Sequence, residues 1–71
     1  MPLPRSVTIS INGEPRELSA ATLEQALREL GYGDAKLATA LNGDFVPARR
    51  RGETALTSGD RIEILTARQG G

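Results

Sequence analysis

The sequence predicts a single α+β domain over residues 1–71, in which one main helix packs on one face of a mixed sheet of four or five strands. Two segments of alternating apolar residues each run into an Asn-Gly dipeptide, at positions 12–13 and 42–43, which is a strong hairpin signal. The segment TLEQALREL between them has apolar residues at helical spacing. A last alternating segment, RIEIL, lies close to the terminal Gly-Gly. At this length, helix and strands must share one small core.

The first hairpin is predicted from the segment VTISI at residues 7–11, whose apolar and polar residues alternate as in a half-buried strand. An Asn-Gly pair follows at once and supplies the positive φ values of a tight turn. The chain should therefore return as a short antiparallel strand over residues 14–18. Pro15 fits only at the start of this strand or on a sheet edge. The two prolines near the start make residues 1–5 a loose, extended lead-in.

The main helix is predicted from TLEQALREL, whose apolar face is formed by Leu23, Ala26, Leu27 and Leu30. Thr22 is a good N-cap, and Gln25, three residues later, can complete a capping box. Gly31 or Gly33 can adopt the left-handed conformation that ends the helix. A helix of about two to three turns is too short to be stable alone, so it must lie on the sheet.

The second hairpin is predicted from LATAL at residues 37–41, a strand with its leucines and threonine facing in and its alanines facing out. Asn-Gly-Asp at 42–44 turns the chain. Phe45 starts a short return strand, which Pro47 soon ends.

The last strand is predicted over residues 61–67, with its two isoleucines on the inner face and Glu63 and Leu65 on the other. The segment before it, 48–60, is expected to be a polar connection closed by a Gly-Asp turn at 59–60. The predicted core consists of Val7, Ile9, Leu27, Leu30, Leu41, Ile62 and Ile64.

Composition argues against a self-contained enzyme. The chain has no cysteine and no histidine, so the usual thiol nucleophile, the usual neutral-pH general base and Cys/His metal sites are all missing, and we expect neither catalytic residues nor a bound metal. Lys+Arg and Asp+Glu both total 9, which gives no general attraction to nucleic acid or to an anionic membrane. No apolar stretch is long enough to span a bilayer, and MPLPRSV lacks the apolar middle of a secretory signal. We therefore expect a cytoplasmic protein.

The outer face of the predicted sheet offers a candidate docking patch for a partner protein, because apolar patches of this kind often mark interaction sites. Its residues are Ala38, Ala40, Phe45 and Leu65. The alternative is that Phe45 caps the small core. Arg49, Arg50 and Arg51 are interpreted as a solvated loop, the alternative being contact with an acidic partner surface.

Five motifs in this order resemble a known family: ING with the following EPREL, TLEQALREL, ALNGDFVP, GDRIEIL and the closing GG. Together they span nearly the whole chain from Val7 and resemble the thiamine-biosynthesis sulfur carrier proteins of the β-grasp, ubiquitin-like superfamily. The family usually shows an arginine and then a tryptophan after VP, whereas this chain has ARRRG there and no tryptophan. No family role is therefore carried over to the three arginines.

The resemblance implies that Gly71 is the reacting residue. In such carriers a ubiquitin-activating-like enzyme uses ATP and magnesium to adenylate the C-terminal carboxylate. A sulfur donor such as a cysteine desulfurase then converts it into a thiocarboxylate, from which thiazole synthase takes the sulfur. The carrier itself binds no cofactor. Gly70, Gln69 and Arg68 would give the end of the chain access to the partner's site: residues 68–71, as a flexible tail without bulk at its tip, extend about 13 Å at roughly 3.3 Å per residue.

Three alternatives share this fold. The chain could be a molybdopterin-synthase small subunit, with the same tail and a different acceptor. It could be a ubiquitin-type protein modifier, in which Gly71 ends in an amide to a lysine. The third alternative is a plain β-grasp interaction module whose Gly-Gly has no chemical role.

Overall fold

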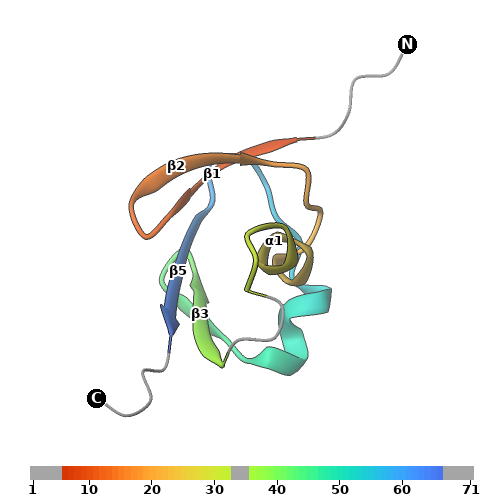
Figure 1. Cartoon of the computed structure of the whole chain (residues 1–71), viewed down its shortest axis with the longest axis vertical. Coiled ribbons are helices and arrows are strands. Elements are labelled where there is room, and N and C mark those ends of the chain that lie inside the picture. Colours follow the sequence, from red (N-terminus) through yellow and green to blue (C-terminus); the bar gives the residue numbers. More distant parts are fainter. Residues whose placement is uncertain (1–5, 33–35, 67–71) are drawn as a thin grey trace.

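The computed structural model describes residues 6–32 and 36–66, which form a five-stranded sheet with one α-helix and one 3₁₀ helix on its inner face. The elements in chain order are β1 (Val7–Ile11), β2 (Glu14–Leu18), α1 (Leu23–Glu29), β3 (Leu37–Leu41), β4 (Asp44–Val46), the 3₁₀ helix η1 (Ala48–Glu53) and β5 (Arg61–Thr66). Figure 1 shows α1 on the concave side of the curved sheet, with η1 in cyan beside it. The predicted α+β architecture is confirmed.

The last strand occupies the middle of the sheet, whose order is β2-β1-β5-β3-β4. β5 is parallel to β1 and antiparallel to β3, so the sheet is mixed as predicted. β2 lies on one edge, where Pro15 leaves no ladder hydrogen bond unmade. β4 forms the other edge and ends directly before Pro47.

Both hairpins turn as type I′. Asn12 and Gly13 have φ values of 51° and 88°, and Asn42 and Gly43 have 52° and 90°. Positive φ at both central residues is the geometry that Asn-Gly favours, and its twist matches that of the paired strands. The dipeptide therefore fixes where each strand ends.

The helix begins and ends near the predicted residues. The Thr22 hydroxyl accepts a hydrogen bond from the Gln25 backbone N–H at 3.2 Å. The Gln25 side chain accepts from the Ala21 N–H at 2.8 Å, one residue before the donor of a standard capping box. Gly31, with φ at 92°, follows the C-cap Leu30 and lets the chain leave the helix.

The core lies between the inner sheet face and α1. Its buried apolar residues are Ile9, Ile11, Leu18, Ala20, Leu23, Ala26, Leu27, Val46, Leu56, Ile62 and Ile64. Four of the seven predicted core residues are in this set. The prediction was wrong in degree for Val7, Leu30 and Leu41, which are only partly buried because each lies at the end of its element and packs against the margin of the core.

The segment predicted to be a polar connection is partly structured. It contains η1 and the buried Leu56, whose N–H donates to the Ala21 carbonyl at 3.0 Å. The Leu23 N–H in turn donates to the Thr54 carbonyl at 2.9 Å, so the connection is fastened to the segment that leads into α1. η1 also approaches the helix closely, since a Cβ on Gly52 would lie 2.8 Å from a Glu24 carboxylate oxygen.

The interpretation of the three arginines as a solvated loop is wrong for Arg51. Its Nε donates to the Thr39 hydroxyl at 3.1 Å, and its Nη2 donates to the Leu37 carbonyl at 2.8 Å. Thr39 is buried and donates its own hydroxyl hydrogen to the Val46 carbonyl at 2.8 Å. Arg51 thus ties η1 to the second hairpin, whereas Arg49 and Arg50 are exposed.

Candidate functional site

The outer face of the sheet carries the largest exposed apolar side chains of the described residues. Phe45 is 69% exposed and Leu65 is 72% exposed. Their register partners bring them together, because Phe45 lies opposite Ala40 and Leu65 lies opposite Ala38 on the neighbouring strand β3. We call these four residues the apolar patch. The alternative that Phe45 caps the core is wrong, since Phe45 points away from it.

The apolar patch lines a depression of about 220 Å³, to which Asn12, Thr39 and Glu63 also contribute. Covering a Phe or Leu side chain with an apolar partner is favourable by about 1.5–3 kcal/mol. Leu65 belongs to β5, so the patch borders the strand that leads toward the C-terminus. The described residues therefore offer a contact surface next to the start of the tail.

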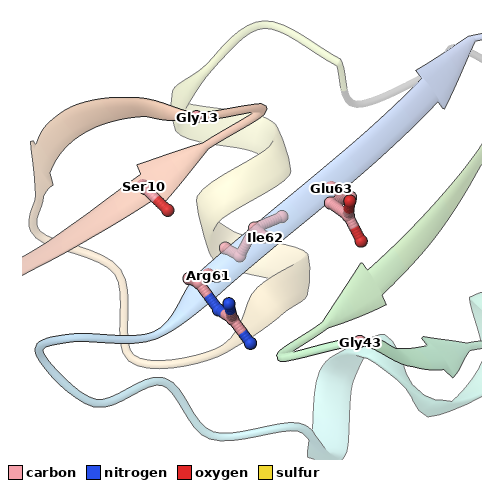
Figure 2. A pocket seen from close by; sticks show the side chains of 6 residues that line it. All are labelled: Ser10, Gly13, Gly43, Arg61, Ile62 and Glu63. Carbon is pink, nitrogen blue, oxygen red and sulfur yellow. The ribbon is translucent and has the colours of Figure 1, made fainter.

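A second hollow, of about 390 Å³, lies on the same face where β5 passes between the two Asn-Gly turns. Figure 2 shows Gly13 and Gly43 on opposite sides of β5, with Ser10, Arg61 and Glu63 around the opening. Glu63 lines both hollows. The outer face is therefore divided into an apolar half around β3 and a polar half around β1.

β5 is held from both sides by the side chains of the two turn asparagines. The Asn12 amide accepts from the Ile64 N–H at 2.8 Å and donates to the Ile64 carbonyl at 3.1 Å. The Asn42 amide accepts from the Arg61 N–H at 2.9 Å and donates to an Asp60 carboxylate oxygen at 3.0 Å. Sequence reasoning used these residues only as turn formers and missed both contacts.

The predicted tail residues Arg68, Gln69, Gly70 and Gly71 lie outside the described residues. The structure describes β5 up to Thr66, which pairs with Leu37 of β3. In the ranges 6–32 and 36–66, no group of three or more His, Cys, Asp or Glu side chains is placed to hold a metal ion. No helix within these ranges combines the length and apolar character needed to cross a membrane.

The model for the ThiS family matches residues 9–71, which is most of the chain and includes the closing Gly-Gly. The chain belongs to the ThiS family. This membership confirms the resemblance found in the sequence and the interpretation of the chain as a carrier and not an enzyme.

Two curated relatives show what this ThiS protein is similar to. The sulfur carrier protein ThiS of Thermus thermophilus is 34% identical over 61 residues, which cover 86% of this chain and 95% of that protein. A thiazole synthase of Paramagnetospirillum magneticum is 40% identical over 62 residues, covering 86% of this chain. The chain spans only 19% of the length of that synthase.

A solved structure confirms the fold. The crystal structure of the thiamine biosynthesis protein ThiS from Geobacter metallireducens superposes with a TM-score of 0.76 at 25% sequence identity. The match covers 92% of this chain and 100% of that one. The predicted β-grasp fold, with one main helix on a mixed sheet, is therefore that of a solved ThiS structure.

Proposed function

We propose that this ThiS protein carries sulfur for the thiazole of thiamine as a thiocarboxylate on Gly71. The observation that carries the proposal is the family match, which continues through the last residue of the chain. The reacting group is a main-chain carboxylate, so the carrier needs no catalytic side chain. This agrees with a sequence that has neither histidine nor cysteine.

The chemistry has two steps, both carried out by partner enzymes. In the first, a carboxylate oxygen of Gly71 attacks the α-phosphorus of ATP and displaces pyrophosphate, which gives an acyl-adenylate. In the second, the outer sulfur of a persulfide on the donor attacks the acyl carbon and displaces AMP, which gives an acyl disulfide. A second thiol of the partner then attacks the donor-side sulfur of this disulfide, so that the thiocarboxylate on Gly71 is freed from the donor and a disulfide remains on the partner. The activating enzyme holds the ATP and magnesium. Glycine suits the terminal, reacting position because its Cα carries no side chain that would obstruct attack at the carboxylate or passage through a narrow channel.

The apolar patch is the proposed docking surface for the activating enzyme. Ala38, Ala40, Phe45 and Leu65 form a surface whose most exposed members can enter apolar pockets of a partner. Because Leu65 lies on β5, docking there places the origin of the tail beside the partner. The segment Arg68, Gln69, Gly70 and Gly71 then spans about 13 Å at roughly 3.3 Å per residue.

The proposed partners follow from the sulfur chemistry. An adenylating enzyme of the ubiquitin-activating type modifies Gly71, a sulfur donor such as a cysteine desulfurase supplies the sulfur, and a thiazole synthase accepts it. The similarity to a segment of a protein named thiazole synthase supports the last of these. The ThiS match favours this pathway over a molybdopterin-synthase subunit and over a ubiquitin-type modifier.

The test is mass spectrometry of the intact chain after incubation with the activating enzyme, Mg-ATP and a sulfur donor. We expect an oxygen-to-sulfur replacement that maps to Gly71, and pyrophosphate exchange that depends on the chain. Deleting Gly71 is the matched control and should abolish exchange, because the carbon that reacts is withdrawn by about 3.3 Å. Full exchange with the deletion variant would exclude the carrier mechanism. Adducts on lysine side chains of other proteins would indicate a modifier instead.

A further inference from the structure

Asn12 does more at β5 than a turn requires. Its backbone N–H donates to the Ile62 carbonyl at 2.9 Å. Its side-chain amide then accepts from the Ile64 N–H at 2.8 Å and donates to the Ile64 carbonyl at 3.1 Å. A primary amide offers the same donor and acceptor pair as a peptide group. The Asn12 side chain thus takes the place of one further residue of β1.

These hydrogen bonds of the Asn12 side chain matter because the backbone pairing of β1 with β5 ends early. The two strands share only the register pairs Ser10 with Arg61 and Ile11 with Ile62, after which β1 turns away. On its other side, β5 pairs with β3 as far as Thr66. Among the described residues, the Asn12 amide is therefore what extends the support of β5 on the β1 side to Ile64. Without it, the end of β5 would be held along one edge.

We propose that Asn12 is a positioning residue for the reaction at Gly71. By holding Ile64 from the β1 side, it fixes the direction of the end of β5, the strand that precedes the reactive end of the chain. The inference rests on the proposed carrier function.

The reason for a kinetic effect is geometric. A strand end that is hydrogen-bonded on both edges has fewer orientations than one bonded on a single edge. Any change of direction at Ile64 displaces Thr66, the last described residue of β5, and so moves the point from which the chain leads to Gly71. A misplacement of about 1 Å can cost on the order of 100-fold in rate. The effect should therefore fall on the rate of adenylation, because the four apolar side chains proposed to dock are unchanged when the Asn12 side chain is removed.

Asn42 provides a matched control within the same chain. It occupies an identical type I′ turn, and its side chain also binds β5. Its contacts, however, lie at the start of β5, at Arg61 and Asp60. Losing the Asn42 side chain therefore removes hydrogen bonds of a similar kind from the opposite end of β5.

The test compares Asn12→Gly with Asn42→Gly in pyrophosphate exchange at varied carrier concentration. Glycine accepts positive φ, so each variant keeps its turn and loses only the side-chain bonds. We expect kcat for Asn12→Gly to fall about ten-fold while KM stays within about two-fold, and Asn42→Gly to stay within about two-fold in both. Hydrogen exchange of the Ile64 amide should accelerate at least about ten-fold in Asn12→Gly alone, since its acceptor is gone.

Each outcome decides a separate question. If the natural chain is inactive in pyrophosphate exchange, the carrier function is overturned. Hydrogen exchange of the Ile64 amide would still show whether the Asn12 side chain holds β5. If the natural chain is active, an unchanged kcat for Asn12→Gly overturns the positioning role, as does a rise in KM alone or an equal loss in Asn42→Gly. All variants are assayed where their circular dichroism matches the natural chain. Should Asn12→Gly not fold, Asn12→Asp keeps the acceptor for Ile64 N–H, loses the donor, and is expected to lower kcat in the same way.

Discussion

The two hairpins have the same Asn-Gly dipeptide in their turns, but the side chains of the two asparagines make different contacts. The φ values of Asn12-Gly13 and Asn42-Gly43 agree within a few degrees. The Asn12 side chain makes part-buried hydrogen bonds to both the N–H and the C=O of Ile64 in β5. The Asn42 side chain binds one backbone group and one exposed carboxylate. A turn signal therefore fixes the local bend, while the tertiary contact of its side chain depends on what lies across the sheet.

The hairpins also differ on the outer face of the sheet. The first hairpin contributes polar residues there, among them Thr8, Ser10 and Glu17. The second contributes Ala38, Ala40 and Phe45. A fold with two similar hairpins around a central strand thus has one half suited to water and one half suited to an apolar partner.

The strongest test of that difference places the same charge on each half of the outer face. Phe45→Asp should weaken the complex with the activating enzyme by about 100-fold, because a large apolar contact is lost and a carboxylate is placed in an apolar interface. Thr8→Asp should weaken it by less than about three-fold. Titration calorimetry of both variants gives the two affinities. Similar losses in both would mean that docking does not distinguish the halves.

The asparagines should differ in their effect on folding stability. Asn12→Gly is expected to lower the free energy of unfolding by about 2 kcal/mol, because the part-buried N–H and C=O of Ile64 lose their partner together. Asn42→Gly should lower it by about 1 kcal/mol, since water can replace its exposed contacts. Urea denaturation followed by circular dichroism measures both. A larger loss of stability in Asn42→Gly than in Asn12→Gly would show that the hydrogen bonds of Asn42 contribute more to holding β5.

The second hairpin has a further support in the charged side chain of Arg51, which donates to Thr39 and Leu37 of β3. Arg51→Leu should destabilise the fold by about 1–2 kcal/mol, because the Leu37 carbonyl loses its charged donor and the Thr39 hydroxyl loses one of its two partners. The neighbouring Arg50→Leu is the control. Its exposed ion pair with Glu53, at 3.7 Å, should contribute less than about 0.5 kcal/mol. Thermal melts of the two variants should therefore separate clearly, and coincident melts would contradict the role of Arg51.

The turn glycines should show the smallest difference. Gly13 and Gly43 have φ values of 88° and 90°, and neither has a heavy atom within 4 Å of an added Cβ. Gly13→Ala and Gly43→Ala should each cost about 1–2 kcal/mol through backbone strain alone, and the two costs should agree within about 0.5 kcal/mol. Urea midpoints provide the measurement. A large difference would mean that the turns are not equivalent even locally.

Local signals explain what the sequence could predict. Alternation in VTISI and RIEIL, the positive φ demanded by Asn-Gly and the Thr22 cap each act within a few residues, so strands, turns and helix could be located from the sequence. The apolar patch followed from the same alternation, because it only requires that Ala38, Phe45 and Leu65 share a face. The core was less accurate at element ends such as Val7, where burial depends on neighbours.

Contacts between distant parts of the chain could not be predicted from the sequence. Leu56 lies in a polar segment without periodicity, and only its packing near α1 explains its burial. Arg51 stands among three arginines, and no local pattern distinguishes the one that reaches Thr39. Asn12 carries a strong turn signal that gives no information on Ile64, its partner from the opposite end of the chain.

The central place of the last strand has a consequence for biosynthesis. A ribosome synthesises both hairpins and the helix before it makes β5, and until then the hairpins have no strand between them to join. The slow pairing of β1 with β5 must therefore follow the translation of β5. A nascent chain interrupted before Arg61 lacks the middle of its sheet and remains a substrate for proteases. The molecules that survive as folded protein are those whose synthesis has passed through β5, a few residues from Gly71.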